Sequence, residues 1–389
     1  MSLADLTQSF FDLWHHFDGV EASRYDSEGP PPALAAFDAE TTRQHGAAFR
    51  ALAAAVEDLD VDRIEDEIDR TVLLDAIRVR LRRVDHERPE RWNPLLWSNR
   101  LRTVLVARAG DADTLAMVPD WVERAVGTIA EPPLLHLELA REDLVAAKAA
   151  LREESTGVEV DLLVVAEQAV DRFDDFLGRE VAPDVRPTAG ALGDDAALWR
   201  LHHDARLEMS PAEAERRLQR RQAELAAALE GAALPIVAAE TELPDAVAIA
   251  GRHPSPIRRR MLAPEAIRGW RIFAREALAG GNPPARLAAL GASFVVTTLG
   301  SLDLAIQTGR TPAAAGIADT AARLPGRAEA LRELLVHPLE AFAAATYAAE
   351  WVQLFRATGD SPAAFAQRVG ATGLLHPTLA SWSFDGDGS

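Results

Sequence analysis

The 389-residue chain contains no cysteine, a single lysine and only two tyrosines. The absence of cysteine excludes disulfides, thiolate metal ligands and thiol nucleophiles, and it fits a reducing compartment. The first residues show no basic stretch followed by an apolar one, and no run approaches about 18 uncharged apolar residues. We therefore expect a cytoplasmic protein without a membrane-spanning segment.

Negative charge exceeds positive charge in this chain. Acidic residues outnumber basic ones, 60 to 41, which gives a net charge of −19. A chain this acidic is repelled by phosphate backbones and by anionic lipid, so neither nucleic acid nor a membrane is an expected partner. The apolar fraction of 48% is ordinary for a globular protein and excludes global disorder.

Helical signals dominate the pattern of the chain. Alternating β-branched residues bounded by Asn-Gly or Asp-Gly turns do not recur, whereas apolar residues follow helical spacing through stretches such as residues 64–77. A capping residue followed by proline predicts three helix starts, and the first of them also has the Glu213 of a capping box. These starts are Ser210-Pro211, Thr311-Pro312 and Ser361-Pro362. We predict an all-α protein.

The breaks between helices are rich in glycine and proline, but none is long enough to be a disordered linker. No repeat of fixed period is present. We predict one helical domain over residues 1–389, with a cleft between two packed halves. These are an N-terminal half at 1–231, an irregular connection at 232–262 and a C-terminal half at 263–389.

Sequence motifs for common cofactors are missing. The chain has no GxGxxG, no P-loop and no GxSxG, and no two of its ten histidines are four residues apart, so the HExxH of a zinc peptidase is absent. Glu333, His337 and Glu340 share one helical face, which is half of a carboxylate-bridged metal site. A proline follows His337 directly and no second set occurs, so a polar patch at a helix break is the better interpretation.

Residues 251–275 form the most unusual segment, with seven arginines and one glutamate in an otherwise acidic chain. Arg268, Arg271 and Arg275 lie at i, i+3 and i+7, on one stripe of a predicted helix. Converging guanidinium groups suit a carboxylate, sulfate or phosphate on a small molecule. The alternative is that these arginines pair with the acidic surface and stabilise it modestly.

The same segment carries a family resemblance. The letters RGWRIFAR at residues 268–275 have the shape of EGWxxYxE with arginine at both glutamate positions, and QTGRT at 307–311 has the shape of DTGxH without its Asp and His. Together with the order of features in residues 121–151 and 207–213, these resemble a family of uncharacterised bacterial helical proteins similar to zinc metallopeptidases. That family bears HExxPGHxxQ followed by EGWxxYxE, and the resemblance implies a large multi-helix metallopeptidase-like body.

The resemblance also implies that the zinc site has been lost. The zinc motif of the family corresponds to residues 240–246, where only the proline matches. The histidine ligands correspond to Glu240 and Ala246, the catalytic glutamate to Thr241 and the third ligand to Arg268. We therefore expect no metal, no cofactor and no zinc peptidase activity.

Two functions remain open at this point. In the first, the recast cleft holds a small anionic molecule, and Glu240 or Glu242 acts as a base in a metal-independent elimination, displacement or cyclisation step of a biosynthetic pathway. The predicted substrate-binding residues are Arg268, Arg271, Arg275, His253, Trp270 and Tyr347. In the second, the cleft is catalytically silent and the chain is a binding or assembly partner of another protein.

Overall fold

The computed structural model describes residues 1–26, 28–35, 38–108, 110–154, 159–230, 246–279, 283–375, 377 and 380. These ranges contain 18 α-helices and two short π-helical segments. No β-strand occurs among the described residues, where Pro133 and Asp184 form an isolated bridge. The described residues are 78% helical, which confirms the predicted all-α fold.

The chain packs as two compact units. Unit 1 comprises residues 1–62 and 73–191, and unit 2 comprises 63–72 and 192–389. The boundary at residue 191 precedes the predicted connection at 232–262, because the helix that begins at Pro211 packs with the C-terminal helices of unit 2. Helix α3 contributes its first turns to unit 2 and the remainder to unit 1.

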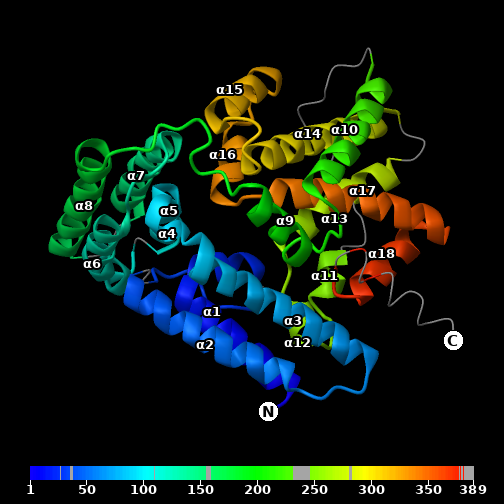
Figure 1. Ribbon diagram of the computed structural model, residues 1–389, viewed down its shortest axis with the longest axis horizontal. Helices are drawn as coiled ribbons and strands as arrows, with labels where there is room; N and C mark the ends of the chain where they lie inside the picture. The colour runs from blue at the N-terminus through cyan, green and yellow to red at the C-terminus, as the bar shows by residue number, and fades with distance from the viewer. Residues whose placement is uncertain are drawn as a thin grey trace. The chain divides into compact units, whose positions relative to one another are not determined.

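Unit 1 is built from paired helices (Figure 1). In it α5 packs against α7, α6 against α8, and α1 against α2. Its helices are α1 (Leu3–Tyr25), α2 (Ala39–Glu57), the end of α3 (Ile64–Arg82), α4 (Pro89–Trp92), α5 (Pro94–Arg108), α6 (Ala112–Thr128), α7 (Leu134–Glu154) and α8 (Val160–Asp175), with π-helical turns at Arg83–Glu87 and Phe176–Glu180.

Unit 2 is organised around helix α17, which packs against α13 and α14 (Figure 1). Helix α10 packs in turn on α14, and α11 on α18. The helices of unit 2 are α9 (Asp194–His203), α10 (Pro211–Ala228), α11 (Ala246–Ala250), α12 (Pro256–Arg260), α13 (Pro264–Leu278), α14 (Pro283–Gln307), α15 (Ala313–Arg323), α16 (Ala328–Val336), α17 (Glu340–Thr358) and α18 (Pro362–Ala371).

Two glycines allow the close approach to α17. A Cβ atom on Gly269 of α13 would lie 2.7 Å from the Cβ of Tyr347, and one on Gly300 of α14 would lie 2.9 Å from the Cβ of Ala345. Real Cβ atoms do not approach so closely, so any larger residue would push the helices apart. The glycine of the RGWRIFAR motif therefore has a packing role.

Asp303 of α14 holds the first turn of α17 in place. The residue before α17, Leu339, has a left-handed backbone with φ of 68° and provides no side-chain cap. The buried carboxylate of Asp303 instead accepts hydrogen bonds from the N–H groups of Leu339, Ala341 and Phe342, at 3.0, 3.1 and 3.2 Å. These donors have no partner within the helix, so a residue from another helix supplies the cap.

Two of the three helix starts predicted from a capping residue and proline are confirmed. Ser210 and Ser361 cap α10 and α18, each followed by proline in the first turn. The Ser210 hydroxyl accepts from the Glu213 N–H at 3.2 Å, whereas the Glu213 side chain accepts from Arg217 and leaves the box half complete. At the third place the prediction was wrong by one residue, because the N-cap is Pro312 and not Thr311.

Helix α14, Pro283–Gln307, is long and apolar enough to cross a membrane by length and composition, with a mean hydropathy of 1.6 in its most apolar stretch. Of that stretch, 56% is buried within the structure. The helix packs on α10, α13 and α17, as a core helix of a globular unit does.

Candidate functional site

The predicted arginine stripe lies on the more exposed face of α13. Arg268 and Arg271 are exposed and Arg275 is half-buried, whereas Trp270 and Phe273 on the other face are 2% and 3% exposed. The amphipathic pattern orients the helix in this way, since the aromatic face packs on α17. None of the three arginines lines either of the two pockets described below.

Trp270 and Tyr347, predicted to bind substrate, are core residues of unit 2. The Trp270 ring packs edge-on against Trp351, with ring centroids 5.9 Å apart. The Tyr347 hydroxyl donates to the Ala205 carbonyl at 3.1 Å, and burial raises the Tyr347 pKa well above its usual value. Both side chains therefore stabilise the packing around α17.

His253 lies half-buried before α12. Its Nδ1 accepts a hydrogen bond from the Ser255 N–H at 3.0 Å, which fixes the ring orientation. Burial lowers the His253 pKa, and the neighbouring Arg258 guanidinium lowers it further. The ring is consequently neutral near pH 7, a state that offers no positive charge to an anion.

The arginine run 258–260 is not a solvated surface. The Arg258 side chain is 1% exposed and forms ion pairs with Asp69 and Glu65 of α3, the latter at 2.7 Å. A Cβ on Gly373 would lie 2.5 Å from the Cβ of Arg258, and Gly373 has a φ of 78° that favours glycine. Arg258 thus holds three distant segments of unit 2 together.

The two carboxylates predicted to act as bases, Glu240 and Glu242, lie outside the described residues. The third ligand position of the resembling family, Arg268, is described and exposed. Within the described ranges no group of three or more His, Asp or Glu side chains is arranged to hold a metal ion. The structure thus directs attention to other residues of unit 2.

A pocket of about 450 Å³ opens between helices α10 and α17. It combines four arginines and two glutamates with apolar side chains, and we call it the arginine pocket. Its lining residues are Met209, Ala214, Arg217, Leu218, Arg220, Arg221, Glu224, Thr346, Ala349, Glu350, Val352, Gln353 and Arg356.

The four arginines of this pocket differ in their partners. Arg217 donates to Glu213 at 2.8 Å, and Arg221 donates to both carboxylate oxygens of Glu276 at 2.5 and 2.6 Å. Arg220 and Arg356 are exposed and have no ion-pair partner within the described ranges. Two cations from different helices are therefore available at one pocket.

Glu350 provides the titratable group of the arginine pocket. It is half-buried on α17, next to Thr346 and Gln353 in the lining. Burial raises the Glu350 pKa to about 7, and the nearby Arg217 only partly opposes this shift. A carboxyl with a pKa near neutrality can take up or release a proton at physiological pH.

A second pocket of about 300 Å³ adjoins the first and shares two lining residues with it. Most of its lining is apolar, and we call it the apolar pocket. Its lining residues are Phe273, Glu276, Ala277, Arg286, Ala289, Leu290, Val352, Phe355 and Arg356.

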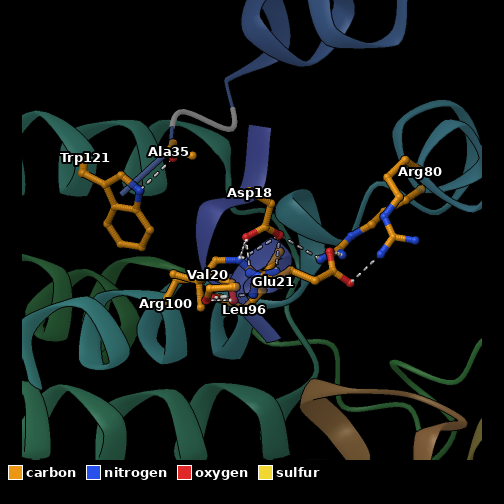
Figure 2. Close-up of polar contacts among 10 residues, drawn as sticks. Asp18, Val20, Glu21, Ala35, Arg80, Leu96, Arg100 and Trp121 are labelled. Atoms are coloured by element: carbon orange, nitrogen blue, oxygen red, sulfur yellow. Dashed lines mark hydrogen bonds and ion pairs between the residues drawn. The ribbon is translucent and has the colours of Figure 1, made fainter. Parts of the chain in front are cut away.

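Unit 1 contains another cluster of charged side chains, drawn in Figure 2, which is a second candidate for a polar site. Asp18 sits at a kink in α1, with φ of −148° and ψ of 77°, and its carboxylate accepts from Arg100 Nε at 3.0 and 3.1 Å. Arg83 bonds to Glu21, and the Arg80 guanidinium stacks on the Trp14 ring at 3.7 Å. These charges compensate one another within unit 1, so the residues of this cluster offer no free cation.

Comparison with known proteins shows the fold alone. No protein-family model and no curated protein matches the chain. A solved structure described as a putative lipoprotein of unknown function from Shewanella oneidensis is similar, with a TM-score of 0.70, 12% identity, and coverage of 99% of this chain and 100% of that one. The crystal structure of a putative lipoprotein from Colwellia psychrerythraea is also similar, with a TM-score of 0.61, 11% identity, and coverage of 99% of this chain and 98% of that one.

These two structures contradict the expected cytoplasmic location. Both are described as putative lipoproteins, a class of membrane-anchored proteins, and both share the fold of this chain over nearly its whole length. The expectation rested on residue composition and on the pattern of the first residues, and neither of these determines where a protein is located, so the expectation was wrong.

The residues of the arginine pocket were missed in the sequence, although a signal was present. Arg217, Arg220, Arg221 and Glu224 lie at i, i+3, i+4 and i+7 of α10, the same type of stripe that was recognised on α13. On α17, Glu350 and the polar residues after it interrupt an alanine-rich, mostly buried helix. A search for polar side chains on an otherwise apolar helix would have identified the residues of α17, whereas the stripe on α10 does not by itself show that it lines a pocket.

Proposed function

We propose that this protein binds a small anionic molecule in the arginine pocket of unit 2, and that Glu350 exchanges a proton with it. The observation that carries the proposal is the pair Arg220 and Arg356. These guanidinium groups come from two helices, line one pocket and lack ion-pair partners among the described residues. In a chain of net charge −19 with carboxylates for most of its arginines, two uncompensated cations at one pocket favour an anionic ligand.

The chemistry of the ligand follows from the donors. Guanidinium groups hydrogen-bond to carboxylate, sulfate or phosphate through a planar fork. The paired Arg217 and Arg221 add positive charge at the same wall without being fully free. The ligand is therefore a small molecule with at least one such group, and neither nucleic acid nor a membrane is part of the proposal.

We infer further that the site supports a metal-independent elimination, displacement or cyclisation, as in a biosynthetic step. In an elimination, the Glu350 carboxylate takes a proton from the carbon next to the one that bears the leaving group, and the electrons of that C–H bond form a double bond. The leaving group departs with its bonding electrons as an anion, which the arginines stabilise. Glu350 here replaces Glu240 and Glu242 in that role. The relationship to the metallopeptidase-like family, with its zinc ligands lost, belongs to this proposal and is supported by the all-α fold and by the RGWRIFAR segment.

Binding of simple anions tests the proposal directly. We expect phosphate and acetate to bind wild-type protein in calorimetric titration, and Arg220→Gln and Arg356→Gln each to weaken binding by about tenfold or more. Arg216→Gln is the matched control, because Arg216 lies on the same helix, is exposed and does not line the pocket. Equal affinities in all four proteins would refute the proposal.

A second candidate function, that of an assembly partner for another protein, has one observation in its favour. Val160, Val164 and Val165 are 71%, 43% and 48% exposed on one side of α8. Exposed apolar residues that gather on one helix face are typical of protein interaction surfaces. If Val164→Asp abolished co-purification of a partner and the arginine variants bound anions normally, this second function would be preferred.

A further inference from the structure

The arginine pocket and the apolar pocket are adjacent and share part of their lining. Both are lined by Val352 and Arg356 of α17. A second connection is ionic, because Arg221 lines the first pocket, Glu276 lines the second, and the two side chains are paired at 2.5 and 2.6 Å. A ligand that contacts Arg356 therefore contacts a residue that lines both pockets.

The apolar pocket has the composition of a site for hydrocarbon or an aromatic ring. Leu290, Val352 and Phe355 are only half-buried, so they keep apolar surface that a ligand would cover. The acidic group in the lining is already neutralised, because Glu276 accepts from Arg221 and from the Ser293 hydroxyl at 3.0 Å. The other charged residues of this lining are Arg286 and Arg356, which are both exposed.

Building on the proposed function, we propose that the ligand is an amphipathic anion. Its anionic group lies between Arg220 and Arg356, and its apolar arm extends past Val352 into the apolar pocket, between Phe273 and Leu290. Arg356 is positioned at the junction, where the head group of such a molecule meets its arm. The arm contributes affinity by burial, and the two arginines fix the end from which it extends.

A homologous series of carboxylates measures the two contributions separately. Acetate, hexanoate and octanoate share the head group and differ in the arm. We expect octanoate to bind wild-type protein at least about tenfold more tightly than acetate, since each fully buried methylene contributes up to about fourfold. Binding of the longer members gives a more negative heat-capacity change, which is the mark of apolar burial. Octan-1-ol, which lacks the charge, binds at least tenfold more weakly than octanoate.

Two variants separate this inference from the proposed function. Ala277→Leu fills the apolar pocket, so it removes the advantage of octanoate and leaves acetate binding unchanged. Arg356→Gln weakens every member of the series by a similar factor. Ala357→Leu is the matched control on α17, because Ala357 is exposed and lines neither pocket. Leu290→Ala, which enlarges the same pocket, tests the arm again if Ala277→Leu does not fold.

Each outcome has a definite meaning. If acetate binds and Arg356→Gln weakens it, but octanoate gains nothing, the amphipathic ligand is refuted and the proposed function stands. If no anion binds at all, both are refuted. If octanol binds as tightly as octanoate, the apolar pocket acts alone and the coupling through Arg356 is wrong. If Arg286→Gln weakens octanoate as strongly as Arg356→Gln does, the second pocket holds another anionic group and the proposed arm is refuted.

Discussion

Asp303 caps a helix to which it does not belong, so its removal should open the first turn of α17. In Asp303→Ala the N–H groups of Leu339, Ala341 and Phe342 lose their acceptor inside the core. A buried donor left unpaired costs about 1–3 kcal/mol, and water entry at a frayed turn recovers part of this. We expect a loss of about 3 kcal/mol in the free energy of unfolding from urea titration, with faster amide exchange confined to the first turn of α17.

Asp319→Ala is the control for this measurement, because Asp319 is exposed and pairs with Arg323 on the surface of α15, so its loss should cost under about 0.5 kcal/mol. A loss below 1 kcal/mol for Asp303→Ala would refute the reasoning. The pH dependence offers a second check. Burial raises the Asp303 pKa from 3.8 to about 7, so its stabilising contribution is complete at low pH and declines as pH rises through 7. Asp303→Asn should therefore cost more at pH 5 than at pH 8, and a cost that grew with pH would contradict this sign.

Three other perturbations follow from the packing and the charges. Gly269→Ala should lower the free energy of unfolding by about 1–3 kcal/mol in urea titration, because the new methyl group meets α17. Its control is Gly127→Ala on α6, where a Cβ has no neighbour within 4 Å, and this variant should raise the free energy of unfolding by up to about 1 kcal/mol. Equal effects of the two variants would disprove the close approach. Arg258→Met leaves the buried Asp69 carboxylate without its Arg258 partner, so it should lower the free energy of unfolding by about 3–5 kcal/mol in the same assay. An unchanged urea midpoint would count against the ion pairs. Since burial raises the Glu350 pKa from 4.5 to about 7, wild-type melting temperature should fall relative to Glu350→Gln between pH 5 and pH 8, and parallel curves would contradict that shift.

The fold class could be predicted because it depends on local signals. Helical spacing and the Ser-Pro starts at Ser210 and Ser361 are written in short windows of sequence, and the structure confirms them. The cap from Asp303 could not be predicted, since a residue 36 positions before Leu339 supplies it. The unit boundary at residue 191 likewise depends on which helices pack together over long distances.

The candidate site was harder to predict for a related reason. An arginine stripe identifies a polar helix face, but it does not show whether that face meets solvent or another helix. The stripe on α13 is largely exposed, and the similar stripe on α10 lines a pocket because α17 lies beside it. Arg258 shows the reverse case, in which a charged run typical of a surface provides the most buried arginine of unit 2.

The glycines at 269 and 300 have a consequence for how the pocket can respond to a ligand. The backbones of α13 and α14 lie so close to α17 at Tyr347 and Ala345 that a Cβ on either glycine would come within 3.0 Å, and this close packing restricts movement of the α17 backbone. The backbone positions of Glu350 and Arg356 are therefore held by one closely packed helix, whereas α10 lines the pocket with long side chains that include the exposed Arg220. Changes of selectivity, by evolution or by design, should consequently be concentrated on residues 217–224 of α10, while the backbone of α17 stays in place.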